Sequence, residues 1–552
     1  MNLIRRHQGL FLLILLLAVS SLACSLFTDG GADEPPRNAV VVRVVANASL
    51  QPWLETAVSN FNAADIKNTE GNPYFVILDT VESGQAVINL SQEDNYTLWI
   101  PEEQVWVNVL ADQGNASYTN DCQSVAESPL VIAMWRSVAE SLGWPGLPLG
   151  WLDIGSLAAD QSAWRYYSGG EFGDTFRLGH THPGLSGTGA STLLALVHAA
   201  QSKTNAVNSE DIQQPIVQAS VGAFEGAVAW FSNNTNTLGA TMSERGIQYL
   251  GAAVMYESTV VHYGNGNIVP VYPLEGTFVA TFPACINESK TAEEQEGARR
   301  FREYLLSVEG QETAVRFGLR PVNEAVTPGP PLDEAHGVDL SQPEIIFAPP
   351  TLDSIYAVQE LWQAARKDVN LVMLLDTSGS MRGDKIENMR NAAIQFVQQM
   401  GDEDFITLIA FSTEPEILAQ HVQVGPNRDK IINAITNLHA EGDTTLYDAI
   451  GLGATIIGET NSVDTTNAMV VLTDGKDTRS YRYSFDSLLI SMATANDTTV
   501  FTIAYGRDAD NNVLQELATQ ANGNFYLGDE ASIAAIYDEM SAAFGGSAGV
   551  GR

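Results

Sequence analysis

Residues 370–381 read NLVMLLDTSGSM, an apolar run that ends abruptly in a cluster of small oxygen-bearing side chains. The run has the length and composition of a central strand in a parallel sheet. Beyond Gly383 the apolar side chains recur with helical periodicity as far as Met400. Ligands of parallel sheets bind at the carboxyl ends of the strands, so this stretch predicts a buried strand that stops at a binding site.

The cluster offers one carboxylate and two hydroxyls, from Asp376, Ser378 and Ser380. Gly379 lets the backbone turn tightly enough for these three side chains to converge. A ligand set made only of oxygens, with few carboxylates, suits a hard divalent ion that keeps some of its waters. The pattern therefore favours Mg2+ (or Mn2+) over Zn2+, although a plain serine-rich turn has the same short sequence.

Two later stretches point to the same edge of the sheet. Residues 442–450 read GDTTLYDAI and open a helix with threonines, and residues 470–475 read VVLTDG, a second apolar strand that ends in Asp474. With this order of elements, the segment from Asp368 to about Phe544 resembles a von Willebrand factor A domain and its metal-ion-dependent adhesion site. The resemblance implies a doubly wound, mostly parallel sheet of the Rossmann-like kind.

The same resemblance gives roles to five side chains. Ser378 and Ser380 are expected to be direct hydroxyl ligands and Thr444 the conditional one. Asp376 and Asp474 are expected to act directly or through water. The last coordination position would accept a carboxylate from a protein partner.

One position departs from the family pattern. Asp443 stands where the family usually has a second glycine. It adds negative charge beside the expected ion. It also leaves open whether Thr444 or Thr445 supplies the hydroxyl.

The chain of 552 residues is long enough for several domains, and its 45% apolar residues can supply their cores. It carries 66 acidic against 28 basic residues, a formal net charge of −38. Binding to a phosphate backbone needs basic clusters, so this charge argues against nucleic acid as a partner. It also argues against adhesion to bare anionic lipid, and is typical of a well-solvated extracellular surface.

The N-terminal residues have the pattern of an export signal. An Arg-Arg pair at positions 5–6 precedes an apolar run over residues 10–19 that is too short to span a membrane comfortably. The run leads into SSLAC at residues 20–24, which resembles the cleavage site of bacterial lipoproteins, although leucine usually stands where this chain has Ser21. The resemblance implies a signal peptide over residues 1–23, lipid attachment at Cys24, a flexible tether over residues 24–38, and anchoring at the extracellular face of the cell membrane.

Cys122 and Cys285 are the cysteines that remain after the export signal. In an exported chain such an even pair predicts one disulfide. Two buried free thiols are the alternative.

Residues 39–45 predict a strand that turns directly into a helix through a segment containing Ser49. The start of a helix presents free backbone N–H groups and a positive dipole end, which suit an anionic or carbonyl-bearing ligand. Ordinary N-capping by Ser49 is the alternative. A second strand-to-helix turn reads PGLSGTGAST at residues 183–192, and it lacks the lysine of a phosphate-binding P-loop.

These two turns, with residues 272–277 before a predicted strand, resemble an extracellular solute-binding protein of bacterial ABC transport systems. The resemblance covers roughly residues 39–321 and implies an α/β clamshell of two lobes, with the domain extending over residues 39–325. The predicted crossings between the lobes lie at residues 128–134 and 269–282. A small solute would be held between the lobes by Ser49, Ser186, Thr188 and Ser191.

Proline-rich segments bracket a stretch of poor pattern, which predicts an interdomain linker over residues 326–367 that holds the two modules apart. The A domain would follow over residues 368–545. The leading hypothesis is a surface-anchored binding protein, and the alternative is a receptor of an ABC transport system with the A domain as its docking module. No enzyme is expected, because neither Ser186 nor Ser378 lies in a nucleophile elbow.

Overall fold

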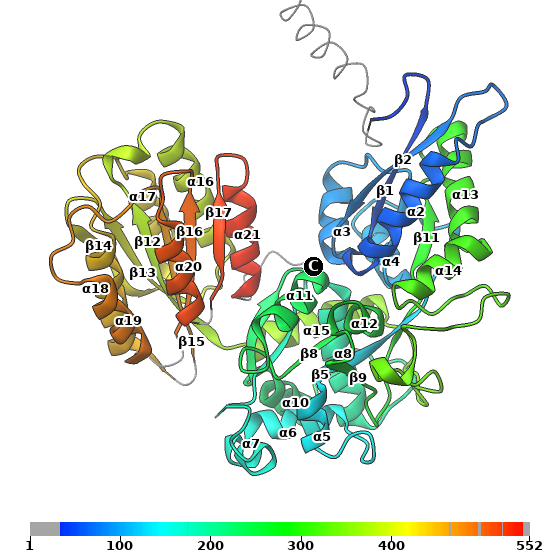
Figure 1. The fold of residues 1–552 in the computed structure, drawn as a ribbon, viewed down its shortest axis with the longest axis horizontal. Coiled ribbons are helices and arrows are strands. Elements are labelled where there is room, and N and C mark those ends of the chain that lie inside the picture. The colour runs from blue at the N-terminus through cyan, green and yellow to red at the C-terminus, as the bar shows by residue number, and fades with distance from the viewer. Residues whose placement is uncertain (1–33, 174, 463–464, 495–497, 522, 545–552) are drawn as a thin grey trace, which may run out of the picture.

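The computed structural model describes residues 34–173, 175–462, 465–494, 498–521 and 523–544. Figure 1 shows three α/β bodies in chain order: a first lobe, a second lobe and a C-terminal domain. The export signal and Cys24 lie outside the described residues. Within the described part of the chain, no helix is long and apolar enough to cross a membrane.

The first lobe is built on a five-stranded sheet in the order β2-β1-β3-β11-β4. Its interior strand β1 corresponds to the strand predicted over residues 39–45, and α2 buries Trp53, Leu54 and Phe61 on one helical face. The later helices α13 and α14 return to this lobe, as Figure 1 shows. The strands are β1 (Val40–Ala46), β2 (Tyr74–Thr80), β3 (Leu98–Ile100), β4 (Cys122–Ser124) and β11 (Pro283–Ile286), and the helices are α2 (Gln51–Ala63), α3 (Ser83–Gln92), α4 (Gln104–Asp112), α13 (Ala292–Leu306) and α14 (Val308–Arg316).

The second lobe is built on a sheet in the order β10-β5-β8-β6-β7, with β9 paired to β5. The long helix α8, which follows the turn at residues 183–192, is buried almost throughout. The strands are β5 (Ser128–Trp135), β6 (Leu178–Thr181), β7 (Val228–Ser232), β8 (Ala252–Tyr256), β9 (Ile268–Val271) and β10 (Val279–Ala280). The helices are α5 (Arg136–Ser141), α6 (Trp151–Ala159), α7 (Gln161–Ser168), α8 (Gly187–Gln201), α9 (Ser209–Ile212), α10 (Pro215–Glu225), α11 (Thr235–Arg245) and α12 (Glu257–Gly264).

The chain crosses between the lobes where β4 leads into β5 and where β10 leads into β11. A third connection runs beside them, because the backbones of Glu127 and Arg320 exchange two hydrogen bonds. This two-lobed arrangement confirms the predicted clamshell. Cys122 and Cys285 face each other across the antiparallel pair β4–β11 and form a disulfide, with 4.0 Å between their Cα atoms.

The stretch predicted as a spacer lies against the second lobe instead of holding the modules apart. Val326, Leu332 and Val338 form a small apolar cluster with Val261 of the second lobe and Val315 of α14. The backbone of Phe347 bonds to Thr277, and α15 (Leu352–Ala365) buries Trp362 against the lobe. The apolar side chains between the prolines pack against the lobe. The proline content of the sequence does not predict this packing.

The C-terminal domain is a six-stranded sheet in the order β14-β13-β12-β15-β16-β17, parallel except for β14. This is the predicted doubly wound sheet. Because β12 and β15 are neighbours, their carboxyl ends meet at one edge. The strands are β12 (Asp368–Asp376), β13 (Phe405–Phe411), β14 (Pro415–Gln423), β15 (Thr465–Thr473), β16 (Thr498–Tyr505) and β17 (Phe525–Gly528), and the helices are α16 (Asp384–Gln399), α17 (Val424–Thr436), α18 (Leu446–Thr460), α19 (Phe485–Thr494), α20 (Asn511–Gln520) and α21 (Ile533–Ala543).

The C-terminal domain touches the second lobe through its last strand and helix. Figure 1 shows α21 on the side of the domain that faces the lobes, where it contacts β7. Arg245 at the end of α11 donates a hydrogen bond to Asn524 Oδ1 at 2.9 Å. The edge of the sheet that carries Asp376 is therefore not the part of the domain used in this contact.

Candidate metal centre and interlobe cleft

Asp376 is the last residue of β12, and its side chain is fully buried. Oδ1 accepts a hydrogen bond from the backbone N–H of Ser378 at 2.7 Å, and Oδ2 accepts one from the Thr473 hydroxyl at 2.6 Å. Burial raises the pKa of Asp376 to about 6, and the nearby charge of Asp474 adds to that rise. A cation bound beside the two carboxylates would offset both effects.

The hydroxyls of Ser378 and Ser380 connect the end of β12 to Asp474, the aspartate that follows β15. The short helix η3 (Gly379–Met381) turns the chain so that Ser378 Oγ and Ser380 Oγ lie 3.0 Å apart. Ser380 Oγ donates to Asp474 Oδ1 at 2.6 Å. Four of the five predicted ligands thus form one connected group at the edge of the sheet.

The fifth predicted ligand, Thr444, lies beside this group. A Cβ added at Gly475 would lie 3.6 Å from Thr444 Oγ1 and 3.9 Å from Ser380 Oγ, so both hydroxyls face the same glycine. The neighbouring Thr445 hydroxyl instead donates to the Ser412 carbonyl at 3.0 Å. Of the two alternatives, Thr444 is therefore the residue positioned to be a ligand.

Two charged residues near the site were not singled out by the sequence. Lys385, in the first turn of α16, pairs its ammonium with Asp474 Oδ2. Arg479 pairs with Asp443 at 2.9 Å, and both side chains are about half exposed. The carboxylate of Asp443, which adds negative charge near the site, is therefore paired with an arginine at the surface.

A third residue, Asp448, organises the loop that follows Asp474. It is buried in the first turn of α18 and accepts hydrogen bonds from the backbone N–H groups of Tyr481, Arg482 and Tyr483 at 2.9–3.2 Å. The position is also favourable for a carboxylate because it lies at the positive end of the helix dipole. The signal available in the sequence was an aspartate within an otherwise apolar stretch predicted to be helical.

Replacing Asp448 with alanine is expected to lower the free energy of unfolding by about 2–3 kcal/mol, because three backbone donors lose their acceptor. Urea unfolding followed by circular dichroism measures the loss. Asp448→Asn is the matched variant, since its remaining carbonyl oxygen can still accept from Arg482 and Tyr483, and it should lose less than half as much. Equal losses in the two variants would contradict this role.

These five side chains fit a hard divalent cation in the chemistry of their donors. Asp376 and Asp474 offer two carboxylates, and Ser378, Ser380 and Thr444 offer three hydroxyls. A donor set made only of oxygens suits Mg2+ or Mn2+. In the described part of the chain, no group of three or more His, Cys, Asp or Glu residues is arranged to hold a metal. A metal bound here would therefore depend on the serine and threonine hydroxyls.

In the cleft between the lobes, the structure brings together some of the predicted solute contacts. Ser186 and Thr188 at the start of α8 are fully buried, with hydroxyls 2.7 Å apart. They continue a chain of hydroxyls that includes Thr181 and Thr235. Ser191 is buried further along the same helix.

Ser49 has a different role from the one expected. Its hydroxyl and backbone N–H both donate to Asn47 Oδ1, at 2.6 and 2.9 Å, so Asn47 and not Ser49 is the capping residue. Asn47 Nδ2 in turn donates to Glu102 Oε2 at 2.7 Å. The space where a solute was expected between the two turns is filled by carboxylates of the protein, Glu82 and Glu102, both buried.

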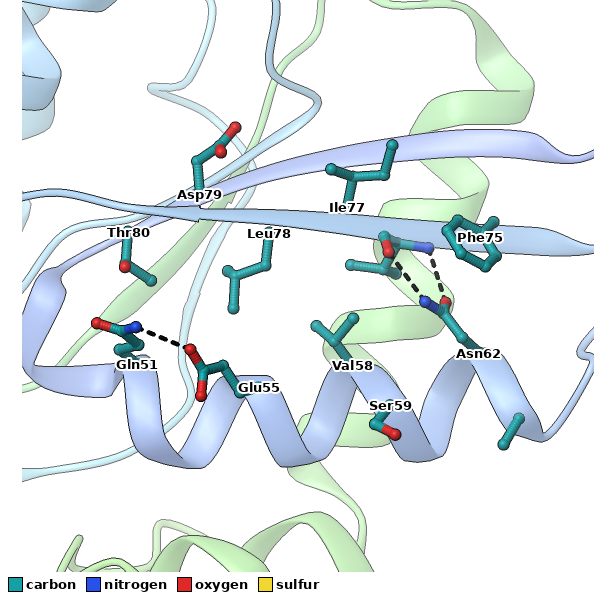
Figure 2. A pocket seen from close by; sticks show the side chains of 12 residues that line it. Gln51, Glu55, Val58, Ser59, Asn62, Phe75, Ile77, Leu78, Asp79 and Thr80 are labelled. Atoms are coloured by element: carbon teal, nitrogen blue, oxygen red, sulfur yellow. Dashed lines mark hydrogen bonds between the residues drawn. The ribbon is translucent and has the colours of Figure 1, made fainter. Parts of the chain in front are cut away.

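Away from the cleft, a groove of about 800 Å3 runs between α2 and the edge strand β2 (Figure 2). Figure 2 shows Asn62 bonded to the strand, and its side-chain amide accepts from Val76 N–H and donates to the Val76 carbonyl at 2.8 and 3.0 Å. This contact closes part of an edge that could otherwise pair with another strand. Gln51 and Glu55, which bond to each other, lie at the other end of the groove.

Two lobes joined by crossing strands, followed by a parallel sheet with an oxygen-lined edge, define a binding protein made of two binding modules. The chain belongs to the family of bacterial extracellular solute-binding proteins, whose model matches residues 42–320, half of the chain. Residues 370–539 match the model of the von Willebrand factor type A domain. An extracellular binding role follows from these two domains.

Each of the following relatives and solved structures matches only part of the chain. An uncharacterized protein of Synechocystis is 30% identical over 161 residues, 29% of this chain and 37% of that protein. Inter-alpha-trypsin inhibitor heavy chain H4 of Sus scrofa is 27% identical over 174 residues, 30% of this chain and 19% of that protein. The chain thus spans well under half the length of these relatives. Among solved structures, the sulfate-binding protein SubI from Mycobacterium tuberculosis H37Rv is 16% identical, with a TM-score of 0.39, over 52% of this chain and 88% of that one.

Proposed function

We propose that this protein is a membrane-anchored extracellular binding protein whose A domain holds Mg2+ (or Mn2+) and grips a carboxylate of a protein partner. A lipid on Cys24 would supply the anchor. The clamshell would capture a small solute or serve as a scaffold. The observation that carries the proposal is the convergence of the two sheet-edge aspartates with the serine hydroxyls and Thr444 at one edge of the sheet.

Ser378, Ser380 and Thr444 would hold the ion through hydroxyls, with Asp376 and Asp474 directly or through water. A cation with few anionic ligands keeps a strong attraction for a further carboxylate, which is what the partner would provide. Lys385 would have to release Asp474 for the carboxylate to serve the ion, because the ammonium contacts it in this structure.

A receptor of an ABC transport system, with the A domain as docking module, is the second candidate. Membership in the solute-binding family favours it. The two buried glutamates where a solute was expected weigh against it, because Glu82 already accepts hydrogen bonds from Ser186 and Thr235, and Glu102 accepts one from Asn47.

The test is a Mn2+ titration of the full chain, followed by the electron paramagnetic resonance of the free ion. We expect the wild type to bind one ion and Asp376→Ala to bind at least tenfold more weakly. Asp443→Ala is the matched control, because Asp443 is exposed and paired with Arg479, and it should bind like the wild type. Equal binding by wild type and Asp376→Ala would refute the site.

A further inference from the structure

Glu82 reaches from the first lobe into the second. It is the residue before α3, yet its side chain does not cap that helix. Oε1 instead accepts a hydrogen bond from the backbone N–H of Thr235 at 2.6 Å, and Oε2 accepts one from the Ser186 hydroxyl at 2.8 Å. Both donors belong to the second lobe, so the carboxylate is bound there as a ligand would be.

The place that receives Glu82 has the chemistry of an anion pocket. Thr235 is the first residue of α11, where free N–H groups and the helix dipole favour negative charge. Asn234 accepts from the next two N–H groups of that turn, which leaves the Thr235 N–H for Glu82. The hydroxyls of Ser186 and Thr188, with Thr181 behind them, complete the pocket, and all are fully buried.

The carboxylate and the pocket depend on each other. Among the described residues, no ion pair includes Glu82, so hydrogen bonds from the second lobe and from Asn47 are its stabilising contacts. A buried carboxylate is costly unless it is well bonded, and the buried donors of the pocket are equally costly without an acceptor. Burial raises the pKa of Glu82, and the hydrogen bonds from Thr235, Ser186 and Asn47 act in the opposite direction by favouring the charged form.

Other contacts across the cleft agree with a closed clamshell. Asn236 Nδ2 donates to the Ala48 carbonyl at 2.6 Å, and the Gln85 N–H donates to the Leu185 carbonyl at 3.1 Å. Glu102 lies directly against Gly187 at the start of α8, where a side chain would collide with its Oε1. The first turns of α8 and α11 are thus covered by the first lobe.

We propose that Glu82 is an internal ligand: its carboxylate occupies an anion pocket of the second lobe and keeps the clamshell closed without a solute. A small carboxylate would bind this pocket only when the Glu82 side chain is displaced or removed. The proposal concerns the closure of the lobes and goes beyond the proposed function, since it holds whether or not the A domain binds a metal. It makes the clamshell a closed scaffold in its resting state.

The test is chemical rescue by acetate, which reproduces the missing carboxylate, measured on the full chain by hydrogen exchange. In Glu82→Ala we expect the Thr235 and Gln85 amides to exchange at least tenfold faster than in the wild type. Millimolar acetate, compared with chloride at equal ionic strength, should restore the slow exchange. The wild type should show no response to acetate, because its pocket is already filled.

Glu103→Ala is the matched control, since Glu103 is also buried and follows Glu102 directly. In this variant the Thr235 and Gln85 amides should not respond to acetate. If Glu82→Ala fails to fold, Glu82→Gln takes its place: it removes the charge but keeps one acceptor oxygen, so exchange at the same amides should rise less than in Glu82→Ala, and acetate should not reverse the rise because the glutamine side chain still fills the pocket. Unchanged exchange in the folded variant would overturn the proposal. So would slowing of the wild-type amides by acetate to the same extent as those of Glu82→Ala.

Discussion

Replacing Asp404 with alanine is expected to destabilise the A domain by about 3–5 kcal/mol, the usual cost of removing one partner from a buried ion pair. Asp404 and Arg366 form that pair at 3.0 Å, with side chains that are only 2% and 5% exposed. The same carboxylate accepts hydrogen bonds from the N–H groups of Val369 and Gly401, at 2.9 and 2.7 Å. Its loss leaves a buried guanidinium and two backbone donors without their acceptor.

The ion pair also joins two modules, because Arg366 follows α15 while Asp404 precedes β13. Urea unfolding followed by circular dichroism measures the effect. Asp402→Ala is the matched control, since Asp402 also pairs with an arginine, Arg428, but is 78% exposed. Exposed pairs contribute roughly 0–1 kcal/mol, so the control should be nearly neutral. Similar losses in the free energy of unfolding for Asp402→Ala and Asp404→Ala would contradict the prediction, because the loss would then not depend on burial.

Loss of the Cys122–Cys285 disulfide is expected to destabilise the first lobe by about 2–5 kcal/mol. The bridge joins residues 163 positions apart, and a long loop constrained in the unfolded chain gives the larger values on the chain-entropy model. It also fixes the pair β4–β11, the point where the chain leaves and re-enters this lobe. The lobe holds the buried indoles of Trp53, Trp99 and Trp106, so its unfolding can be followed by tryptophan fluorescence.

The measurement compares wild type with Cys122→Ser, each with and without reductant. Reductant should destabilise the wild type to about the level of the variant, and it should leave the variant unchanged. Alkylation under non-reducing conditions gives an independent check. Two reactive thiols at Cys122 and Cys285 in the freshly exported, folded protein would contradict the bridge.

Much of the A domain follows from local sequence. The apolar run 371–375 has the length and composition of a strand buried on both faces, and the oxygen-bearing cluster after it is encoded within five residues. The second strand ends in Asp474 in the same way, and alternating strands and helices bring such ends to one edge. These features are local, so periodicity and turn residues are sufficient to predict them.

Contacts between segments far apart in the sequence could not be predicted and are seen only in the tertiary structure. Lys385 reaches Asp474 across 89 positions of sequence, and Glu82 reaches Thr235 across 153. In a sequence, such charged residues resemble solvated loop positions, because burial depends on what packs over them. The choice of Thr444 over Thr445 also rests on a distant partner, since the Ser412 carbonyl takes the Thr445 hydroxyl.

The sequence by itself determined that this chain is a two-lobed α/β clamshell followed by a doubly wound A domain with an oxygen-lined edge. The clamshell and the A domain were predicted from resemblances to known families, and the individual strands, helices and oxygen-bearing turns from patterns that act over a few residues. Only the tertiary structure decided that residues 326–367 pack on the second lobe and that the cleft is filled by the protein's own carboxylates. Both outcomes depend on which surfaces meet after folding, and burial and hydrogen bonding between segments far apart in sequence set the free energy of those contacts.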